Sequence, residues 1–104
     1  MENIAFKMKL YSGYSEEYKR RHGVIWPELM KLLKDAGVTD YSIFLDEETN
    51  IVFASLKAVD ITWLNELAAT DIMKEWWAYM ADIMESHADN SPVIVPLKEI
   101  FYMQ

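Results

Sequence analysis

Four short stretches of the chain carry the alternating or continuous apolar pattern of β-strands. The turn-forming residues 46–50 separate the two middle stretches and predict a hairpin loop between them. Pro96 lies in the last stretch and indicates an edge strand or a bulge, because proline cannot donate a ladder hydrogen bond. The predicted strands comprise residues 4–10, 41–45, 51–57 and 93–103.

Between the strands, apolar residues take the three-to-four-residue spacing of helices. A polar helix with Ser15 as its N-cap is expected over residues 14–22, and Gly23 interrupts it. Pro27 suits the first turn of a second helix, which runs to residue 36 with Gly37 just beyond its end. Its core face comprises Leu29, Leu32 and Leu33.

The second half of the chain also predicts two helices. The first is short and begins at Asp60 or Thr62. The second, capped by Thr70 or Asp71, covers residues 72–84. Its apolar stripe comprises Ile72, Met73, Trp76, Trp77, Met80 and Met84.

The resulting order is β-α-β-β-α-β within a single domain of residues 1–104. This is the order of the ferredoxin-like α+β fold, a four-stranded antiparallel sheet with helices on one face. The middle strands are apolar on both sides, since Phe44 and Phe53 alternate with other apolar residues. The face without helices therefore needs a partner, and we expect a homodimer packed sheet to sheet, a dimeric α+β barrel.

The amino-acid composition and the net charge argue against several classes of function. The absence of cysteine excludes disulfides, thiolate metal sites and cysteine nucleophiles, and no apolar run is long enough to span a membrane. The net charge of −7 is unfavourable for binding nucleic acid, which requires a basic patch. The N-terminal residues lack the features of a signal peptide, so we expect a cytoplasmic protein.

Two aromatic patterns carry candidate chemistry. Tyr14, Tyr18 and His22 follow one another at helical i, i+4 spacing, and a histidine titrates near neutral pH. His22 is therefore either a proton-transfer group or a hydrogen-bonded structural histidine, whereas His87 is expected in solvent. Trp76 and Trp77 point about 100° apart on a helix, so one packs on the sheet while the other reaches a cavity or an interface.

Other residues are less informative. Tyr41 either orients a ligand through its hydroxyl or simply favours a strand. Arg20 and Arg21 are expected in surface or interface ion pairs. No phosphate-binding loop, metal-binding motif or nucleophile elbow is present, so we expect no metal and no cofactor. Once these types of chemistry are excluded, acid–base catalysis on a small neutral molecule remains as a possible activity.

Several motifs together resemble the L-rhamnose mutarotase family over essentially the whole chain. The most specific is the block from Tyr18 to His22 followed by Ile25-Trp26-Pro27-Glu28-Leu29. The others are Tyr41-Ser42-Ile43, Thr70-Asp71 with Trp76-Trp77, Asp89-Asn90-Ser91-Pro92 and Phe101-Tyr102.

The resemblance implies a cytoplasmic, dimeric isomerase that interconverts the α and β anomers of L-rhamnose without a cofactor. It implies that His22 is the proton donor and that the sugar contacts Tyr18, Tyr41, Trp76 and Trp77. As an imidazolium, His22 would protonate the ring oxygen, while water, Tyr18 or a carboxylate would serve as the base. Two alternatives are a haem-degrading or cofactor-free monooxygenase of the same fold and a non-catalytic module that binds a small molecule.

Overall fold

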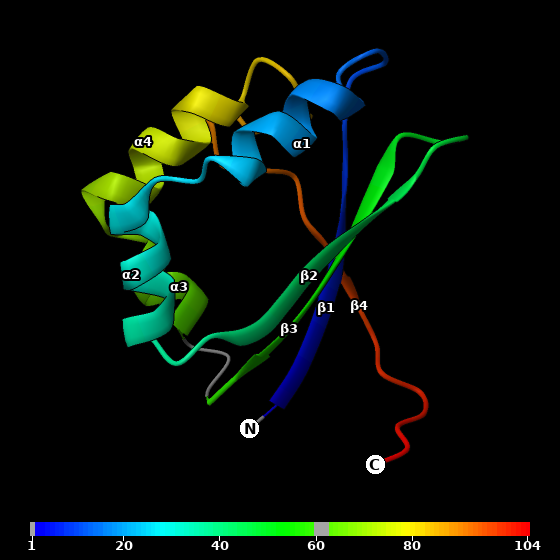
Figure 1. Cartoon of the computed structure of the whole chain (residues 1–104), viewed down its shortest axis with the longest axis vertical. Coiled ribbons are helices and arrows are strands. Elements are labelled where there is room, and N and C mark those ends of the chain that lie inside the picture. The colour runs from blue at the N-terminus through cyan, green and yellow to red at the C-terminus, as the bar shows by residue number, and fades with distance from the viewer. Residues whose placement is uncertain (1, 60–62) are drawn as a thin grey trace.

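The computed structural model describes residues 2–59 and 63–104, so the predicted helix start at Asp60 or Thr62 lies outside the described residues. All the described helices lie on one side of the sheet (Figure 1). The elements are β1 (Glu2–Lys9), α1 (Ser15–Gly23), α2 (Pro27–Asp35), β2 (Thr39–Asp46), β3 (Ile51–Ala58), α3 (Trp63–Ala68), α4 (Asp71–Met80) and β4 (Val95–Leu97).

The sheet has the strand order β2-β3-β1-β4, and every neighbouring pair is antiparallel. This arrangement confirms the ferredoxin-like α+β fold. β1 and β3 pair along their full lengths, from Glu2 opposite Ala58 to Lys9 opposite Ile51. The hairpin loop between β2 and β3 is also confirmed, and Asn50 adopts a left-handed φ of 61° at its end.

The hydrophobic core lies between the sheet and the helices. Val52, Ala54 and Leu56 of β3 are each 1% exposed, and Phe6 and Met8 of β1 lie beside them on the same face. The opposite face of the sheet has no helix over it (Figure 1), and there Phe44 is 64% exposed and Phe53 37% exposed. The prediction of a sheet with apolar residues on both faces is thus confirmed.

The end of α2 follows the sequence prediction closely. Pro27 occupies the first turn, and Leu29 is buried in the core. Gly37 follows the C-cap with a φ of +87°, which an L side chain adopts only with strain. The amides of Gly37 and Val38 donate to the carbonyls of Lys34 and Leu33, at 3.0 and 3.1 Å. These two bonds form the Schellman arrangement that ends a helix.

Two predicted boundaries are wrong. The last helix ends at Met80 rather than Met84, because Met84 forms an antiparallel bridge with Leu10 and the Ile83 carbonyl accepts a bond from Tyr11. The last strand covers only Val95–Leu97 of the predicted residues 93–103. Beyond it the strand pairing with β1 ends, and the chain continues as an exposed, irregular segment (Figure 1).

Candidate active site

Helix α1 brings Tyr18 and His22 together on one side. Their ring centroids are 4.4 Å apart and the rings are tilted by 33°. Tyr18 is buried and His22 is half-buried. Tyr14, the third member of the predicted stripe, takes the N-cap position that was predicted for Ser15, and its side chain is exposed. The helix therefore directs two of the three predicted residues into the fold.

The orientation of the His22 ring fixes which nitrogen is available for chemistry. Nδ1 lies 3.1 Å from the backbone carbonyl oxygen of Tyr18. A carbonyl only accepts, so Nδ1 carries a proton, and in the neutral ring Nε2 has the free lone pair. Burial lowers the pKa of His22, and the bond to the Tyr18 carbonyl partly opposes this shift. At pH 7 the neutral form with a basic Nε2 therefore predominates.

The two tyrosines of the site remain protonated at neutral pH. Burial raises the pKa of Tyr18 well above its usual value, and the neighbouring Tyr41 phenol raises it further. Burial also raises the pKa of Tyr41 to about 12. Tyr41 nevertheless keeps 40% of its surface exposed. Both hydroxyls can therefore donate hydrogen bonds, and neither is a base at pH 7.

An irregularity in β2 precedes Tyr41. The pairing register with β3 shifts between Thr39 and Ser42, which is where a bulge or similar irregularity lies. Asp40 within this segment adopts a φ of 52°, a left-handed conformation that is uncommon for a residue other than glycine. Bulges re-aim side chains along a strand, and Tyr41 is the residue that follows Asp40.

Aromatic rings enclose the other side of His22. Trp76 of α4 is buried and meets the imidazole edge-on, with the ring centroids 5.5 Å apart. Trp26 meets Trp76 at 5.1 Å and stacks with Tyr79 at 5.6 Å. Trp77 is half-buried against the core, and the aromatic contacts within the described residues do not join it to His22. The two tryptophans thus have different surroundings, as their helical positions predict.

Arg21 has a place in the site that sequence reasoning missed. Arg20 forms the expected surface ion pair, with a side chain 60% exposed and Nη2 2.7 Å from Glu17. Arg21 instead is only 8% exposed and binds Asp82, 61 positions along the chain, at 2.8 Å. The Glu17–Arg21 spacing of one helical turn was the available local signal. It gives no indication of the long-range partner.

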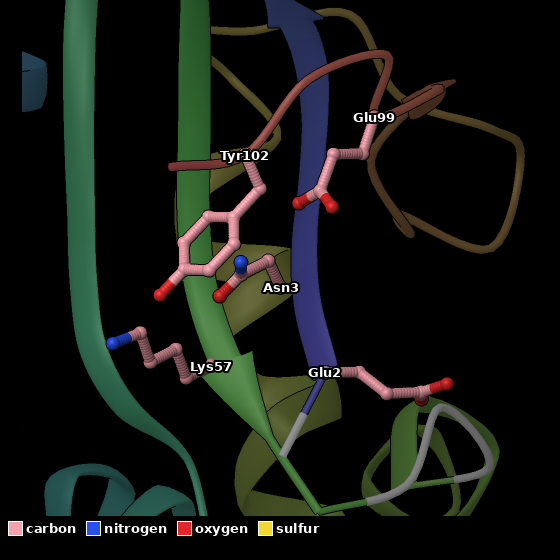
Figure 2. Close-up of a pocket in the computed structure, with 5 residues that line it drawn as sticks. All are labelled: Glu2, Asn3, Lys57, Glu99 and Tyr102. Atoms are coloured by element: carbon pink, nitrogen blue, oxygen red, sulfur yellow. The ribbon is translucent and has the colours of Figure 1, made fainter. Parts of the chain in front are cut away.

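Two cavities have linings that do not include His22. One of about 560 Å³ is formed by the ends of β1 and β3 and by the C-terminal segment (Figure 2), and its lining comprises Glu2, Asn3, Lys57, Glu99 and Tyr102. The other, of about 340 Å³, is lined by Trp26, Pro27, Glu28, Ile72 and Glu75. The first lacks an imidazole. The second borders the aromatic cluster at Trp26.

Neither metal chemistry nor a membrane crossing is indicated by the described side chains. Within residues 2–59 and 63–104, no group of three or more His, Asp or Glu side chains is placed to hold a metal ion. None of the helices in the described part of the chain has the length and apolar character that a membrane crossing needs.

Comparison with known proteins extends these observations. The family model for L-rhamnose mutarotase matches residues 3–103. The chain is 55% identical to an L-rhamnose mutarotase of Formosa agariphila over 104 residues, which is 100% of both chains. It is 57% identical to one of Mesorhizobium japonicum over 102 residues, which covers 98% of this chain and 97% of the relative.

Solved structures agree with the sequence relatives. The crystal structure of an L-rhamnose mutarotase from Formosa agariphila matches with a TM-score of 0.94 and 54% identity, over 100% of both chains. An antibiotic biosynthesis monooxygenase matches with a TM-score of 0.52 and 10% identity, covering 96% of this chain and 99% of the other. The second likeness reflects a shared fold alone.

Proposed function

Because the chain belongs to the L-rhamnose mutarotase family, we propose that it interconverts the α and β anomers of L-rhamnose, as an isomerase that works by acid–base catalysis. The observation that supports this chemistry best is the setting of His22. Its Nδ1 is held by a backbone carbonyl, its ring is flanked by Tyr18 and Trp76, and its Nε2 is left as a base.

The proposed reaction opens and closes the sugar ring through His22 alone. Nε2 accepts the proton of the anomeric hydroxyl as C1 becomes a carbonyl and the bond from C1 to the ring oxygen breaks. The imidazolium so formed donates that proton to the released ring oxygen. Rotation about C1–C2 presents the other carbonyl face, and the same transfers in reverse close the ring as the other anomer. General acid–base help of this kind typically contributes about 10²- to 10⁴-fold.

This scheme revises the expectation that His22 begins as an imidazolium with a separate base. The lowered pKa of His22 favours the neutral ring at the start of the cycle. The raised pKa of Tyr18 argues against this phenol as the base. Since both oxygens that exchange the proton are bonded to C1, one nitrogen can serve them in turn.

The remaining site residues hold the sugar in the proposal. The hydroxyls of Tyr18 and Tyr41 donate to sugar oxygens, which their raised pKa values support. Trp76 and Trp77 cover the C–H face of the ring and the methyl group of the 6-deoxy sugar. The edge-on packing of Trp76 against His22 supports a place for Trp76 beside the reacting atoms. The role of Trp77 depends on family resemblance.

The proposal includes a homodimer formed through the open faces of two sheets. Exposed apolar residues on this face support it, and they lie on three strands: Phe44 on β2, Phe53 on β3, and Val95 and Leu97 on β4. Lys7 of β1 lies between Phe53 and Val95 on this face, so the apolar residues flank a lysine. Exposed apolar residues gathered on one face are typical of an interaction surface. A cytoplasmic location is also part of the proposal, and the family resemblance supports it.

The test follows the relaxation of optical rotation after fresh L-rhamnose dissolves, with and without the protein, alongside L-fucose, D-galactose and D-ribose. We expect accelerated relaxation that is strongest for L-rhamnose. A protein that binds L-rhamnose but leaves the relaxation rate unchanged is a binding module and contradicts the proposal. Added haem distinguishes the monooxygenase alternative, because axial ligation by His22 would shift the Soret band.

A further inference from the structure

Helix α1 depends on only two buried side chains for its attachment to the fold. These are Tyr18 and Arg21 among its nine residues. A helix this short is not stable by itself in water, so its orientation depends on what these side chains hold. Tyr18 packs in the core and also belongs to the proposed sugar-binding set, so Arg21 is the buried anchor of this helix that lies outside that set.

The guanidinium of Arg21 ties α1 to the end of α4 through its two terminal nitrogens. Nη1 donates to the Tyr79 carbonyl at 2.7 Å and to Asp82 Oδ1 at 2.8 Å, while Nη2 donates to Asp82 Oδ2 at 3.3 Å. Nε donates to Glu17 Oε2 at 2.7 Å, within α1 itself. The Tyr79 carbonyl is one of the last in α4, where a cation is favourable.

Arg21 is also linked to the imidazole of His22 through contacts between aromatic side chains. The carbon at the centre of the guanidinium lies 4.4 Å from the centroid of the Tyr79 ring. Tyr79 packs against Trp76 at 5.7 Å, and Trp76 meets His22 at 5.5 Å. Arg21 and His22 are consecutive in α1. A series of side-chain contacts therefore connects Arg21 through Tyr79 and Trp76 to His22, its neighbour in the helix.

We propose that Arg21 is a positioning residue for the mutarotase reaction. By clamping α1 against the end of α4, it sets the direction in which His22 Nε2 meets the sugar. The inference rests on the role of His22 proposed above. A misplacement of about 1 Å at a reacting group can cost about 100-fold in rate, so a small rotation of α1 is enough to matter. Lysine cannot replace the clamp, because it lacks the planar fork that engages Asp82 with two bonds.

The test compares Arg21→Lys, Asp82→Asn and the double variant by kcat, KM and thermal unfolding. Lys19→Met, which removes a positive charge from an exposed position of the same helix, is the matched control. We expect Arg21→Lys to lower kcat about 10-fold with KM changed less than about 3-fold. Asp82→Asn should lower kcat about 3-fold, and the double variant should be no slower than Arg21→Lys. Lys19→Met should match the wild type.

Two results would overturn the proposal. One is a lower melting temperature with kcat unchanged, which makes Arg21 a stabilising anchor only. The other is a rise in KM alone, which assigns it to sugar binding. If Arg21→Lys does not fold, Asp82→Asn decides in its place by the same criteria. A parallel His22→Asn variant separates the proposed role of His22 from that of Arg21. Full activity in His22→Asn refutes the role of His22. An inactive His22→Asn together with normal kinetics in Arg21→Lys refutes only the role of Arg21.

Discussion

Both faces of the sheet carry apolar side chains, but in very different surroundings, and on the open face they lie beside polar residues such as Lys7 and Ser55. Along β3, Val52 and Leu56 are almost completely buried under the helices, whereas Phe53 lies between them in sequence and is partly exposed on the other face. The chain's own helices bury the first of these faces, and the helix α1 that carries His22 is one of them (Figure 1). No helix in the described part of the chain covers the open face (Figure 1). The helix-covered face stabilises the fold, and the open face is the surface through which the proposed homodimer would form.

The first prediction concerns a substitution that disrupts the proposed dimer interface on the open face. Phe53→Asp places a carboxylate on the open face, between Phe44 of β2 and Lys7 of β1. Burying a carboxylate in an interface is costly even beside a lysine, because both charges lose their hydration, so we expect the association constant of the dimer to fall by at least about 100-fold. Sedimentation velocity over a concentration series measures it. The control is Val24→Asp, at an exposed apolar residue outside the sheet. Equal dimerisation of both variants would contradict the account.

The second prediction compares the faces directly, in the monomeric Phe53→Asp background. Leu56→Ala should lower the free energy of unfolding by about 3 kcal/mol, because it leaves a cavity in the core. Phe44→Ala removes a larger side chain but should cost less than about 1 kcal/mol, since 64% of that residue is already in water. Urea unfolding measures both. Equal losses would mean that the open face also stabilises the monomer.

The third prediction concerns Trp77, whose proposed contact with sugar rests on resemblance. Trp77→Ala should weaken L-rhamnose binding about 10-fold, as expected when a ring face covered by an aromatic side chain is uncovered. Met73→Ala, at another half-buried position of α4, should leave the affinity unchanged. Isothermal titration measures the affinity and a thermal melt the stability. An unchanged affinity with a collapsed melting temperature would make Trp77 a core residue.

The smallest expected effect is a pH dependence of stability from His22. Its pKa is lowered in the folded protein, so the unfolded chain binds this proton first as pH falls. The contribution is complete above the ordinary histidine pKa of 6.5 and is lost on acidification from there towards the lower pKa of the folded state. A single group contributes at most about 1.4 kcal/mol per pH unit.

Urea unfolding of wild type and His22→Asn between pH 7.5 and 5 isolates this contribution. The wild type should lose more stability than the variant over this range. Carboxylates with lowered pKa values, such as Glu17 at about 2, lose their contribution as pH falls from the ordinary value of 4.5 towards the folded one, and both proteins carry them, so they do not separate the two curves. Parallel curves for the two proteins would contradict the assigned burial of His22.

The sequence predicted the features that depend on local pattern. The strand and helix order, the Gly37 helix end and the pairing of Tyr18 with His22 follow from periodicity within a few residues. The end of α4 was mispredicted because Met84 bonds across to Leu10, which no local pattern shows. Arg21 was missed for the same reason. Arg20 and Arg21 are chemically alike in the sequence, and only the tertiary fold brings one of them to Asp82.

The central claim is that neutral His22 transfers the proton that opens the sugar ring. Saturation-transfer NMR on L-rhamnose between pH 5 and 8, corrected for the uncatalysed rate, tests it with wild type and His22→Asn side by side. We predict that the wild-type rate rises with pH to a plateau as His22 loses its proton, and that His22→Asn falls at least about 100-fold to a pH-independent residual rate. Full activity in His22→Asn, or a wild-type rate that falls as pH rises, would contradict the account.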